Sequence, residues 1–444
     1  MKRAESGMPA SADAVVIGAG LGGLATAIRL QQHGLAVVLI ERLDRVGGLC
    51  GSFLHDDGYR YVIACNDFGK GLLGDLAQLG IEHRFERSAT RIFTGERNYR
   101  LPPDLRTVAG LLPHAGAILR YVRGLRRARA AGHLRPGSLV ELIDDCRISG
   151  RAADLLMLPA YLMGVAPDRF RLDALDDEFH YGYGYATPIT PVGGPQALAD
   201  AFRDRFLALG GQLLLGCEML GIDQNASRNL VQTTGGPLAA DIVVSTLPKP
   251  GHHPERFAPG LALSMLLLRI DSRHALPAGI HTHVYYPPDI RHWFRDLYEG
   301  RLPTEFGFHF FSSDLGDQGG VRTANVYFYL PAGREDDPRV QQLARAFVLL
   351  RLETLLPGIT GQLRGATLLA PADFRARHGL DSRVTPVITP AGFAKPANHC
   401  ARTGIYYAGA AAHPPGEHAG AAVRSSGYVC ELVMKRMKET LHAN

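Results

Sequence analysis

The sequence lacks the features that mark secreted, metal-binding or membrane-spanning proteins. Its six cysteines are scattered over 444 residues without a C-x-x-C pair, so neither a zinc site nor a disulfide framework is predicted. The longest apolar stretches, such as 261–268, are far too short to cross a bilayer. The first residues, MKRAESGMPASAD, contain no apolar core, so a secretory signal is not predicted. We therefore expect free thiols in a cytoplasmic protein that is soluble or at most membrane-associated.

A strong excess of charge is also missing. The net charge of +5 argues only weakly for acidic partners. Arginines do gather among apolar residues at 108–136, and a basic amphipathic helix of this kind can lie on an anionic membrane. The alternative is a solvated surface helix. Only Tyr121 could stack on bases there, so no nucleic-acid partner is expected.

Glycine, in contrast, is abundant, and its clearest pattern lies near the start of the chain. A β-branched run at 14–17 is followed by Gly18-Ala19-Gly20-Leu21-Gly22-Gly23, a helical stretch to His33 and a second apolar run at 36–40. The G-x-G-x-x-G pattern between a strand and a helix predicts a dinucleotide-binding fold. In such a fold, the second glycine lets the backbone approach a pyrophosphate, and the third lets the helix pack on the strand.

Glu41 ends the second predicted strand. A carboxylate at this place can bind both hydroxyls of a ribose and disfavours a 2′-phosphate, so NADP is not expected. A second Gly47-Gly48 pair follows after a few residues. These motifs together resemble the FAD-dependent amine-oxidase and phytoene-desaturase superfamily, and bacterial carotenoid desaturases in particular. That family usually has an arginine after Gly-Gly, whereas this chain has Leu49-Cys50.

A distant segment carries the same resemblance. Residues 404–409 form a predicted strand that ends in glycine, and Gly420-Ala421-Ala422 opens the C-terminal helix after a loop rich in proline and glycine. Small residues let a helix N-terminus approach a flat ring, where its dipole stabilises the negative charge of reduced flavin. The chain keeps the family's His413-Pro414 but has Glu417-His418-Ala419 where the family is usually glycine and apolar.

The resemblance implies bound FAD, and the residues themselves give little reason to expect a metal, although a histidine pair on one face can ligate one. His281 and His283 share a face of a predicted strand, but no cysteine or carboxylate cluster stands nearby in the sequence. The implied position of Met219 is against the adenine side of the cofactor. The expected FAD contacts are Gly18, Gly20, Leu21, Gly22, Gly23, Glu41, Arg42, Gly48, Leu49, Met219, Gly409, Ala410, Gly420, Ala421 and Ala422.

Flavin oxidation also requires that the substrate lose a proton. We hypothesise that His413, Glu417 and His418 lie beside the flavin, since histidine titrates near neutral pH. The loop 64–67 is a second candidate, because the family commonly has a small turn there while this chain has Cys65, Asn66 and Asp67. Asp67 is therefore a further candidate for the proton acceptor.

The predicted fold is α/β, with a Rossmann-type FAD-binding domain of the glutathione-reductase kind interleaved with an α+β substrate-binding domain. The resemblance assigns 12–67, 187–250 and 366–440 to the first domain, and 68–186 and 251–365 to the second.

We expect an FAD-dependent oxidoreductase that desaturates or isomerises carbon–carbon bonds of an apolar isoprenoid, polyene or specialised metabolite. One alternative is an amine oxidase acting on a C–N bond. Another is a non-catalytic prenyl-binding protein, because Rab GDP-dissociation inhibitors share the architecture. The intact set of Gly18, Gly20, Gly23 and Glu41 argues against that last alternative.

Overall fold

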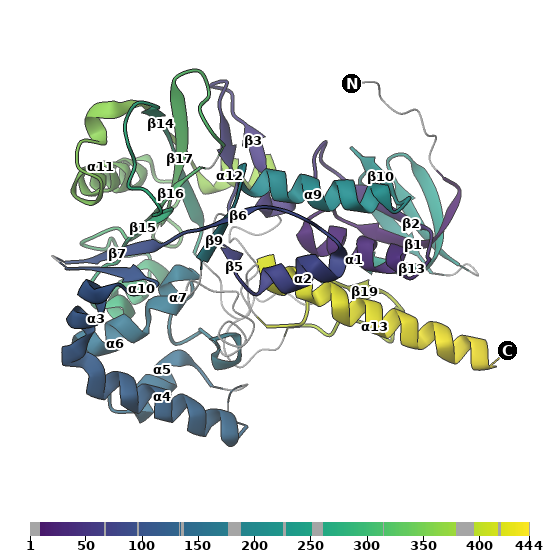
Figure 1. The fold of residues 1–444 in the computed structure, drawn as a ribbon, viewed down its shortest axis with the longest axis horizontal. Helices are drawn as coiled ribbons and strands as arrows, with labels where there is room; N and C mark the ends of the chain where they lie inside the picture. Colours follow the sequence, from purple (N-terminus) through teal and green to yellow (C-terminus); the bar gives the residue numbers. More distant parts are fainter. Residues whose placement is uncertain are drawn as a thin grey trace.

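The computed structural model describes residues 9–65, 68–95, 97–132, 134, 137–175, 188–224, 228–250, 261–313, 315–378, 395–415 and 419–443. It has two lobes, each built around its own seven-stranded sheet (Figure 1). The first described residues and the end of the last helix both lie on the lobe with the first sheet.

The first sheet has the strand order β10-β2-β1-β13-β12-β11, and β19 also pairs with β13. Strands β10, β2, β1, β13 and β19 are parallel, whereas β11 and β12 form antiparallel pairs. A buried parallel sheet needs crossover connections, and this is the Rossmann-type arrangement that the sequence predicts. The strands are β1 (Ser11–Ile17), β2 (Val37–Glu41), β10 (Gln212–Leu215), β11 (Met219–Asp223), β12 (Asn229–Thr233), β13 (Gly236–Ser245) and β19 (Tyr406–Tyr407).

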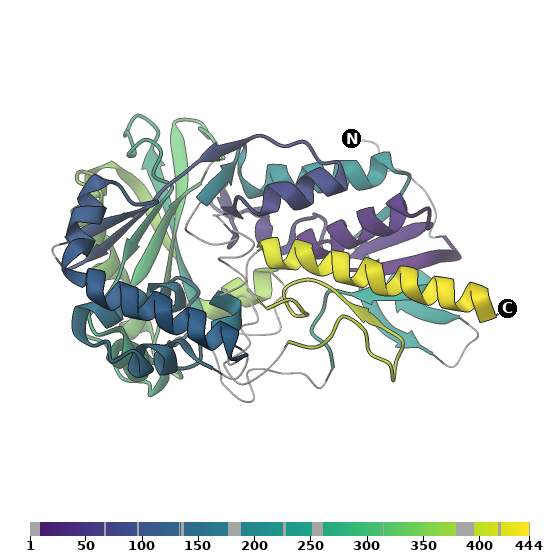
Figure 2. The ribbon, with the colours of Figure 1, turned by 60° about the horizontal axis from the view of Figure 1, so that its bottom comes forward.

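Three helices, α1 (Leu21–Gln32), α9 (Gly194–Ala208) and α13 (Ala419–Ala443), cover one face of this sheet. Helix α1 packs against both of the others, and α2 (Leu72–Leu79) joins the same core. Figure 2 shows α13, in yellow, running along this lobe. The last described helix therefore covers the first one.

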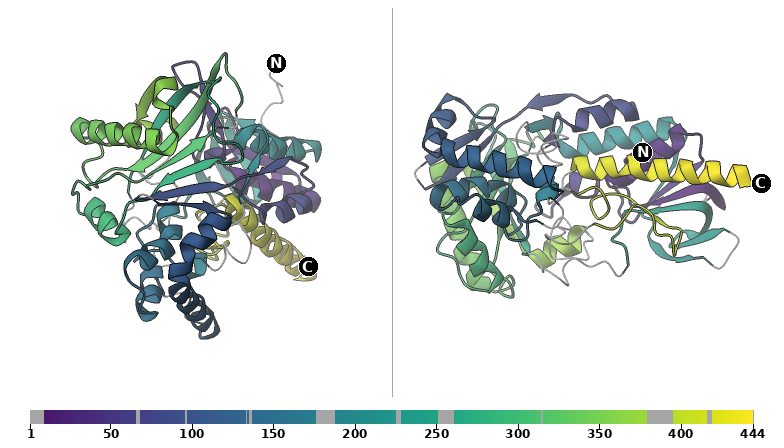
Figure 3. Two further views of the ribbon diagram at one scale, coloured as in Figure 1. Left: turned by 60° about the vertical axis from the view of Figure 1, so that its left-hand side comes forward. Right: turned by 90° about the horizontal axis from the view of Figure 1, so that it is seen from below.

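The second sheet has the order β18-β14-β17-β16-β15-β7-β8. Alternate side chains of its strands enter two different cores, as the two-residue period of a strand requires. One face packs on α11 (Pro338–Leu355), and the other packs on α5–α7 and α10 (Figure 3). The strands are β7 (Thr90–Thr94), β8 (Arg97–Leu101), β14 (Leu263–Asp271), β15 (Thr282–Tyr285), β16 (Phe308–Ser312), β17 (Val321–Tyr329) and β18 (Leu363–Leu369).

The remaining helices lie mostly on the second lobe. They are α5 (Leu139–Asp145), α6 (Gly150–Leu156), α7 (Leu158–Leu162), α10 (Ile290–Tyr298), α12 (Pro371–His378) and the short 3-10 turns η1 (Gly48–Cys50) and η4 (Thr360–Gln362).

The basic stretch at 108–136 spans parts of α3 (Leu105–Leu111), η2 (Leu112–His114) and α4 (Ala115–Ala130). Leu105 and Leu112 are 89% and 66% exposed. Over the described ranges, every helix is too short or too polar to span a bilayer. Contact of this surface with a membrane stays a prediction.

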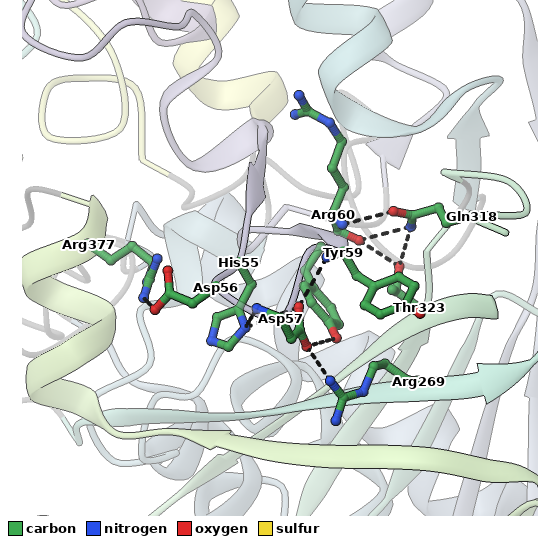
Figure 4. Close-up of polar contacts among 10 residues, drawn as sticks. His55, Asp56, Asp57, Tyr59, Arg60, Arg269, Gln318, Thr323 and Arg377 are labelled. Carbon is green, nitrogen blue, oxygen red and sulfur yellow. Dashed lines mark hydrogen bonds and ion pairs between the residues drawn. The ribbon is translucent and has the colours of Figure 1, made fainter.

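A small hairpin of β3 (Ser52–Leu54) and β4 (Arg60–Val62) ties the lobes together (Figure 4). The carboxylate of Asp57 accepts hydrogen bonds from the Tyr61 hydroxyl at 2.8 Å and from Arg269 on β14 at 2.9 Å. Burial raises the pKa of Asp57, but hydrogen bonds from Tyr61, the Tyr59 amide and His55 outweigh it and keep the pKa below its usual value. Its ion pair with Arg269 therefore persists at neutral pH.

A three-stranded sheet, β5-β9-β6, lies at the junction of the lobes. It brings β5 (Phe68–Gly69) and β6 (Phe85–Arg87) beside β9 (Pro188–Pro191). Two segments assigned by sequence to the substrate domain thus pair with one assigned to the FAD domain. The predicted fold, a Rossmann-type domain interleaved with an α+β domain, is confirmed, while the domain boundaries stay a prediction.

Candidate active site

The glycine-rich turn after β1 opens toward a cavity between the lobes. Gly18 has φ +95°, a conformation that favours glycine. Gly20 precedes α1 in an extended conformation, and the helix start has no side-chain cap. A Cβ added at Gly20 would meet nothing within 4 Å, and Gly20 lines the cavity. The N-terminus of α1 therefore presents open backbone, as an anion site requires.

The next two glycines are in tight contact with other backbone. A Cβ at Gly23 would collide with the Gly18 carbonyl oxygen, which is the close helix–strand packing that the motif predicts. A Cβ at Gly22 would lie 2.7 Å from the Gly409 Cα atom and 3.0 Å from the Ala422 carbonyl oxygen. Gly22 is thus the point where the N-terminal turn meets the segment between β19 and α13.

The carboxylate of Glu41 is held at the end of β2. Its two oxygens accept hydrogen bonds from the backbone N–H of Ala19 at 2.7 Å and of Leu43 at 2.9 Å. Arg42 points to the surface, where it pairs with Glu218 at 3.6 Å, and Met219 follows on β11. The N–H of Cys217 donates to the Glu41 carbonyl at 2.8 Å, so the end of β2 lies beside the segment that leads into β11.

The second glycine pair, Gly47-Gly48, packs against the glycine-rich turn that follows β1. The N–H of Gly47 donates to the Ala19 carbonyl at 2.8 Å, and a Cβ at Gly48 would lie 3.2 Å from the Gly20 Cα atom. Leu49 follows and lines the cavity together with Leu21, Gly22 and Gly23.

The C-terminal segment completes this wall. Gly409, Ala410, Ala419 and Ala422 line the cavity, and the N–H of Gly409 donates to the Ser425 hydroxyl at 2.6 Å. Gly420 and Ala421 are buried in the first turn of α13. The two expected halves of the cofactor site, far apart in the sequence, therefore meet at one cavity.

The opposite wall is aromatic and aliphatic. It is formed by the end of α7 and by one face of β14, β16 and β17 in the second lobe. The hydroxyl of Tyr161 donates to the Tyr285 carbonyl at 2.6 Å, and that of Tyr327 donates to the Ile63 carbonyl at 2.8 Å. The wall residues are Tyr161, Leu162, Met163, Leu263, Phe311, Tyr327 and Tyr329.

One imidazole ring also belongs to this wall. His309, on β16, lines the cavity, and its Nε2 atom has no hydrogen-bond partner among the described residues. Burial lowers the pKa of His309 to about 3, so the imidazole is neutral at physiological pH. A buried imidazole nitrogen without a partner would gain from a hydrogen bond with a bound molecule, either as acceptor or as donor.

Of the four catalytic candidates from the sequence, His413 is the one that the structure describes. The ring of His413 packs on Tyr428 of α13, with centroids 4.9 Å apart, and its carbonyl accepts a hydrogen bond from Asn398 at 2.8 Å. His413 is not among the described residues that line the cavity. Glu417, His418 and Asp67 lie outside the described residues. The roles of all four stay predictions.

The geometry fits a dinucleotide cofactor. The open backbone at Gly20, the uncapped start of α1 and the carboxylate of Glu41 have the arrangement that a pyrophosphate and a ribose need. The cavity continues from there to the apolar wall, where a flat ring would have room beside Gly409 and Ala422.

The apolar wall and His309 were not predicted from the sequence. Residues 308–312 read Phe-His-Phe-Phe-Ser, and strand alternation puts His309 and Phe311 on one face. A histidine on the same face as an aromatic residue in a buried strand was the available signal. It does not say which face meets a cavity, because that depends on strands β14 and β17 elsewhere in the chain.

Comparisons with known proteins agree with this geometry. The model of the flavin containing amine oxidoreductase family matches residues 21–434. A phytoene desaturase (lycopene-forming) from Pseudescherichia vulneris is 26% identical, over 94% of this chain and 99% of the relative.

Solved structures share the fold. An oxidoreductase from Methanosarcina mazei has a TM-score of 0.68 at 17% identity, covering 94% of this chain and 99% of that one. A putrescine oxidase bound to putrescine has a TM-score of 0.61 at 16% identity, covering 96% and 99%.

Proposed function

The chain belongs to the flavin containing amine oxidoreductase family, and from this premise we propose that it desaturates or isomerises carbon–carbon bonds of an apolar, polyene-like substrate. That it is an FAD-dependent oxidoreductase follows from the family and from its phytoene desaturase relatives. The proposal concerns the substrate and the bond. Its alternative within the family is oxidation of an amine at a C–N bond.

The apolar wall of the cavity carries this proposal. Among the residues that the structure describes, no carboxylate, amide side chain or lysine lines the cavity. An ammonium group would lose its hydration there without gaining a counter-charge, which is costly. A hydrocarbon chain would instead gain by leaving water, at roughly 25 cal/mol for each Å² that it buries. The wall therefore favours a hydrocarbon over an amine.

A pair of aromatic rings beside the flavin would favour the amine alternative, and Tyr406-Tyr407 was the pair to consider. Both are buried in β19, which pairs with β13 in the first sheet. Tyr406 enters the core with α1 and α13, and Tyr407 enters the core on the opposite face. Neither is among the described cavity-lining residues, so they give the amine alternative no support.

The chain's own residues would bind and orient the reactants. Gly20, Gly22, Gly409 and Ala422 would hold FAD, which supplies the hydride acceptor when bound. The aromatic wall would exclude water and align the hydrocarbon. His309 would take up or return the proton at Nε2, because it is the histidine that lines the cavity in the described part of the chain.

We expect replacement of His309 by phenylalanine to lower kcat about 100-fold or more, the usual size of a general acid–base contribution, while FAD content is unchanged. Because burial holds the His309 pKa at about 3, its titration should cause no inflection in kcat between about pH 5 and 8. The measurements are flavin absorbance per protein and kcat as a function of pH.

His413→Phe and His418→Ala are the matched comparisons. Unchanged turnover in the His309 variant, with a large loss in either of the others, would assign the proton transfer to the loop at 413–418 instead.

The substrate proposal is tested by flavin bleaching without oxygen. Purified holoprotein is mixed anaerobically with polyenes presented in detergent, and separately with a panel of primary and secondary amines. We expect polyenes to bleach the oxidised flavin, with an extracted product that has lost two hydrogens and gained a double bond, and the amines to leave the flavin unchanged. Bleaching by amines alone would establish the C–N alternative.

A further inference from the structure

Two cysteines, Cys50 and Cys65, line the cofactor cavity and are neighbours in space. Cys50 is the last residue of η1, and Cys65 follows β4. The backbone N–H groups of Ala64 and Cys65 both donate to the Leu49 carbonyl, at 3.2 and 3.1 Å. The Cys50 and Cys65 thiols are in hydrogen-bond contact with each other. The contact is thus set by backbone on both sides, and not only by side-chain rotamers.

Both cysteines also stand at places where the sequence departs from the resembling family. Cys50 stands in the segment where the family usually has an arginine, and Cys65 stands in a loop that is commonly a small turn. Each departure introduces a cysteine, and folding brings the two together. The remaining cysteines, Cys146, Cys217, Cys400 and Cys430, are buried, and none of them lines this cavity in the described structure.

We propose that Cys50 and Cys65 form a redox-active dithiol in the wall of the FAD site and close reversibly to a disulfide. Nothing in the proposed polyene chemistry requires this pair, so it is an additional two-electron site. Both are free cysteines, and the backbone hydrogen bonds on either side of Cys50, from Cys65 to Leu49 and from Ile63 to Gly51, hold the two segments side by side.

The reaction needs an oxidant, and a low-molecular-weight disulfide such as glutathione disulfide is sufficient. The thiolate of Cys65, which is only partly buried, attacks one sulfur, and the first glutathione thiolate leaves. Cys50 then gives up its proton and attacks the Cys65 sulfur, and the second glutathione thiolate leaves. The two protein thiols are oxidised, and one disulfide is reduced to two thiols.

The environments of the two sulfurs assign their order of attack. Cys50 is buried, whereas Cys65 is only partly buried, so a low-molecular-weight disulfide reaches the Cys65 sulfur first, and Cys50 resolves the mixed disulfide. The hydrogen bond with Cys65, followed by burial, also raises the pKa of Cys50. The geometry makes the second step intramolecular, which is why the cross-link should prevail over the mixed disulfide.

The test uses full-length holoprotein in glutathione buffers of increasing oxidised share. Thiols are trapped with N-ethylmaleimide, and the digested protein is analysed by mass spectrometry. We expect a Cys50–Cys65 linked peptide lacking two hydrogens to appear as the oxidised share rises, and to vanish on reduction. Cys50→Ala should stop at glutathione on Cys65, whereas Cys65→Ala should leave Cys50 alkylated. Cys146→Ala is the matched control and should form the cross-link normally.

Alkylation of both cysteines at every glutathione ratio would overturn the proposal. Stable glutathione on Cys65 of the unmodified sequence, without a cross-link, would overturn it as well. The readout is the wild-type peptide mass, so it does not depend on the folding of any variant. It requires neither substrate nor turnover, so failure of the polyene proposal would leave this result unaffected.

Discussion

Replacement of Gly22 by alanine is expected to destabilise the protein by about 1–3 kcal/mol, the usual cost of an overpacked methyl group, and to remove most of its FAD. The new Cβ would lie 2.7 Å from the Gly409 Cα atom and 3.0 Å from the Ala422 carbonyl oxygen. Both neighbours are backbone, so neither can turn aside as a side chain would. Either α1 or the start of α13 must move, and both line the cofactor cavity.

The measurements for Gly22→Ala are the denaturant midpoint of unfolding and the ratio of flavin to protein absorbance. Gly427→Ala is the matched control, because Gly427 lies within α13 and a Cβ there would meet nothing within 4 Å. That change should be neutral or stabilise the protein by about 0.5–1 kcal/mol. If Gly22→Ala retains normal stability and flavin, the two ends of the chain do not meet as described.

Replacement of Gly20 by alanine should weaken FAD binding without lowering the stability of the apoprotein, unlike the replacement of Gly22. Gly20 has φ −69° and ψ 171°, a conformation open to alanine, and a Cβ there would meet no protein atom within 4 Å. The methyl group would project where the pyrophosphate approaches the backbone. We therefore expect FAD affinity to fall at least about tenfold, equivalent to about 1.4 kcal/mol, while the apoprotein unfolds at the wild-type midpoint.

Titration of the apoprotein with FAD, followed by quenching of flavin fluorescence, gives this affinity. Gly427→Ala again serves as the control and should bind FAD as the wild type does. Wild-type affinity in the Gly20 variant would mean that the phosphates do not approach α1 at this residue, and the assignment of the turn would be wrong.

The parts of the site that sequence predicts best are the ones encoded within a few residues. The turn at 18–23, the helix after it and the strand ending in Glu41 form one local unit, with the helix predicted at 22–33 and found at Leu21–Gln32. Each glycine of the turn is required for a steric reason of its own, and these requirements hold in any chain with the same local geometry. For this reason, the FAD-binding fold could be predicted before any contact was known.

The apolar wall could not be predicted in the same way. Leu263, His309 and Tyr329 come from three strands, and only their pairing in the second sheet brings them to one face. Strand alternation predicts that each strand has two faces, but not which face meets the cofactor. The contact between Cys50 and Cys65 escaped for a similar reason, because their spacing of fifteen residues matches no recognised motif.

The order of elements along the chain also has a consequence for biosynthesis. Arg29 of α1 donates to the Ser426 hydroxyl of α13 at 3.0 Å, across 397 positions of sequence. A ribosome therefore releases β1 and α1 long before β19 and α13 exist to cover them. During that interval the growing chain exposes an apolar helix face, so it is a natural client for chaperones. Loading with flavin should then follow the synthesis of α13, and yellow colour would report that this helix has docked on α1.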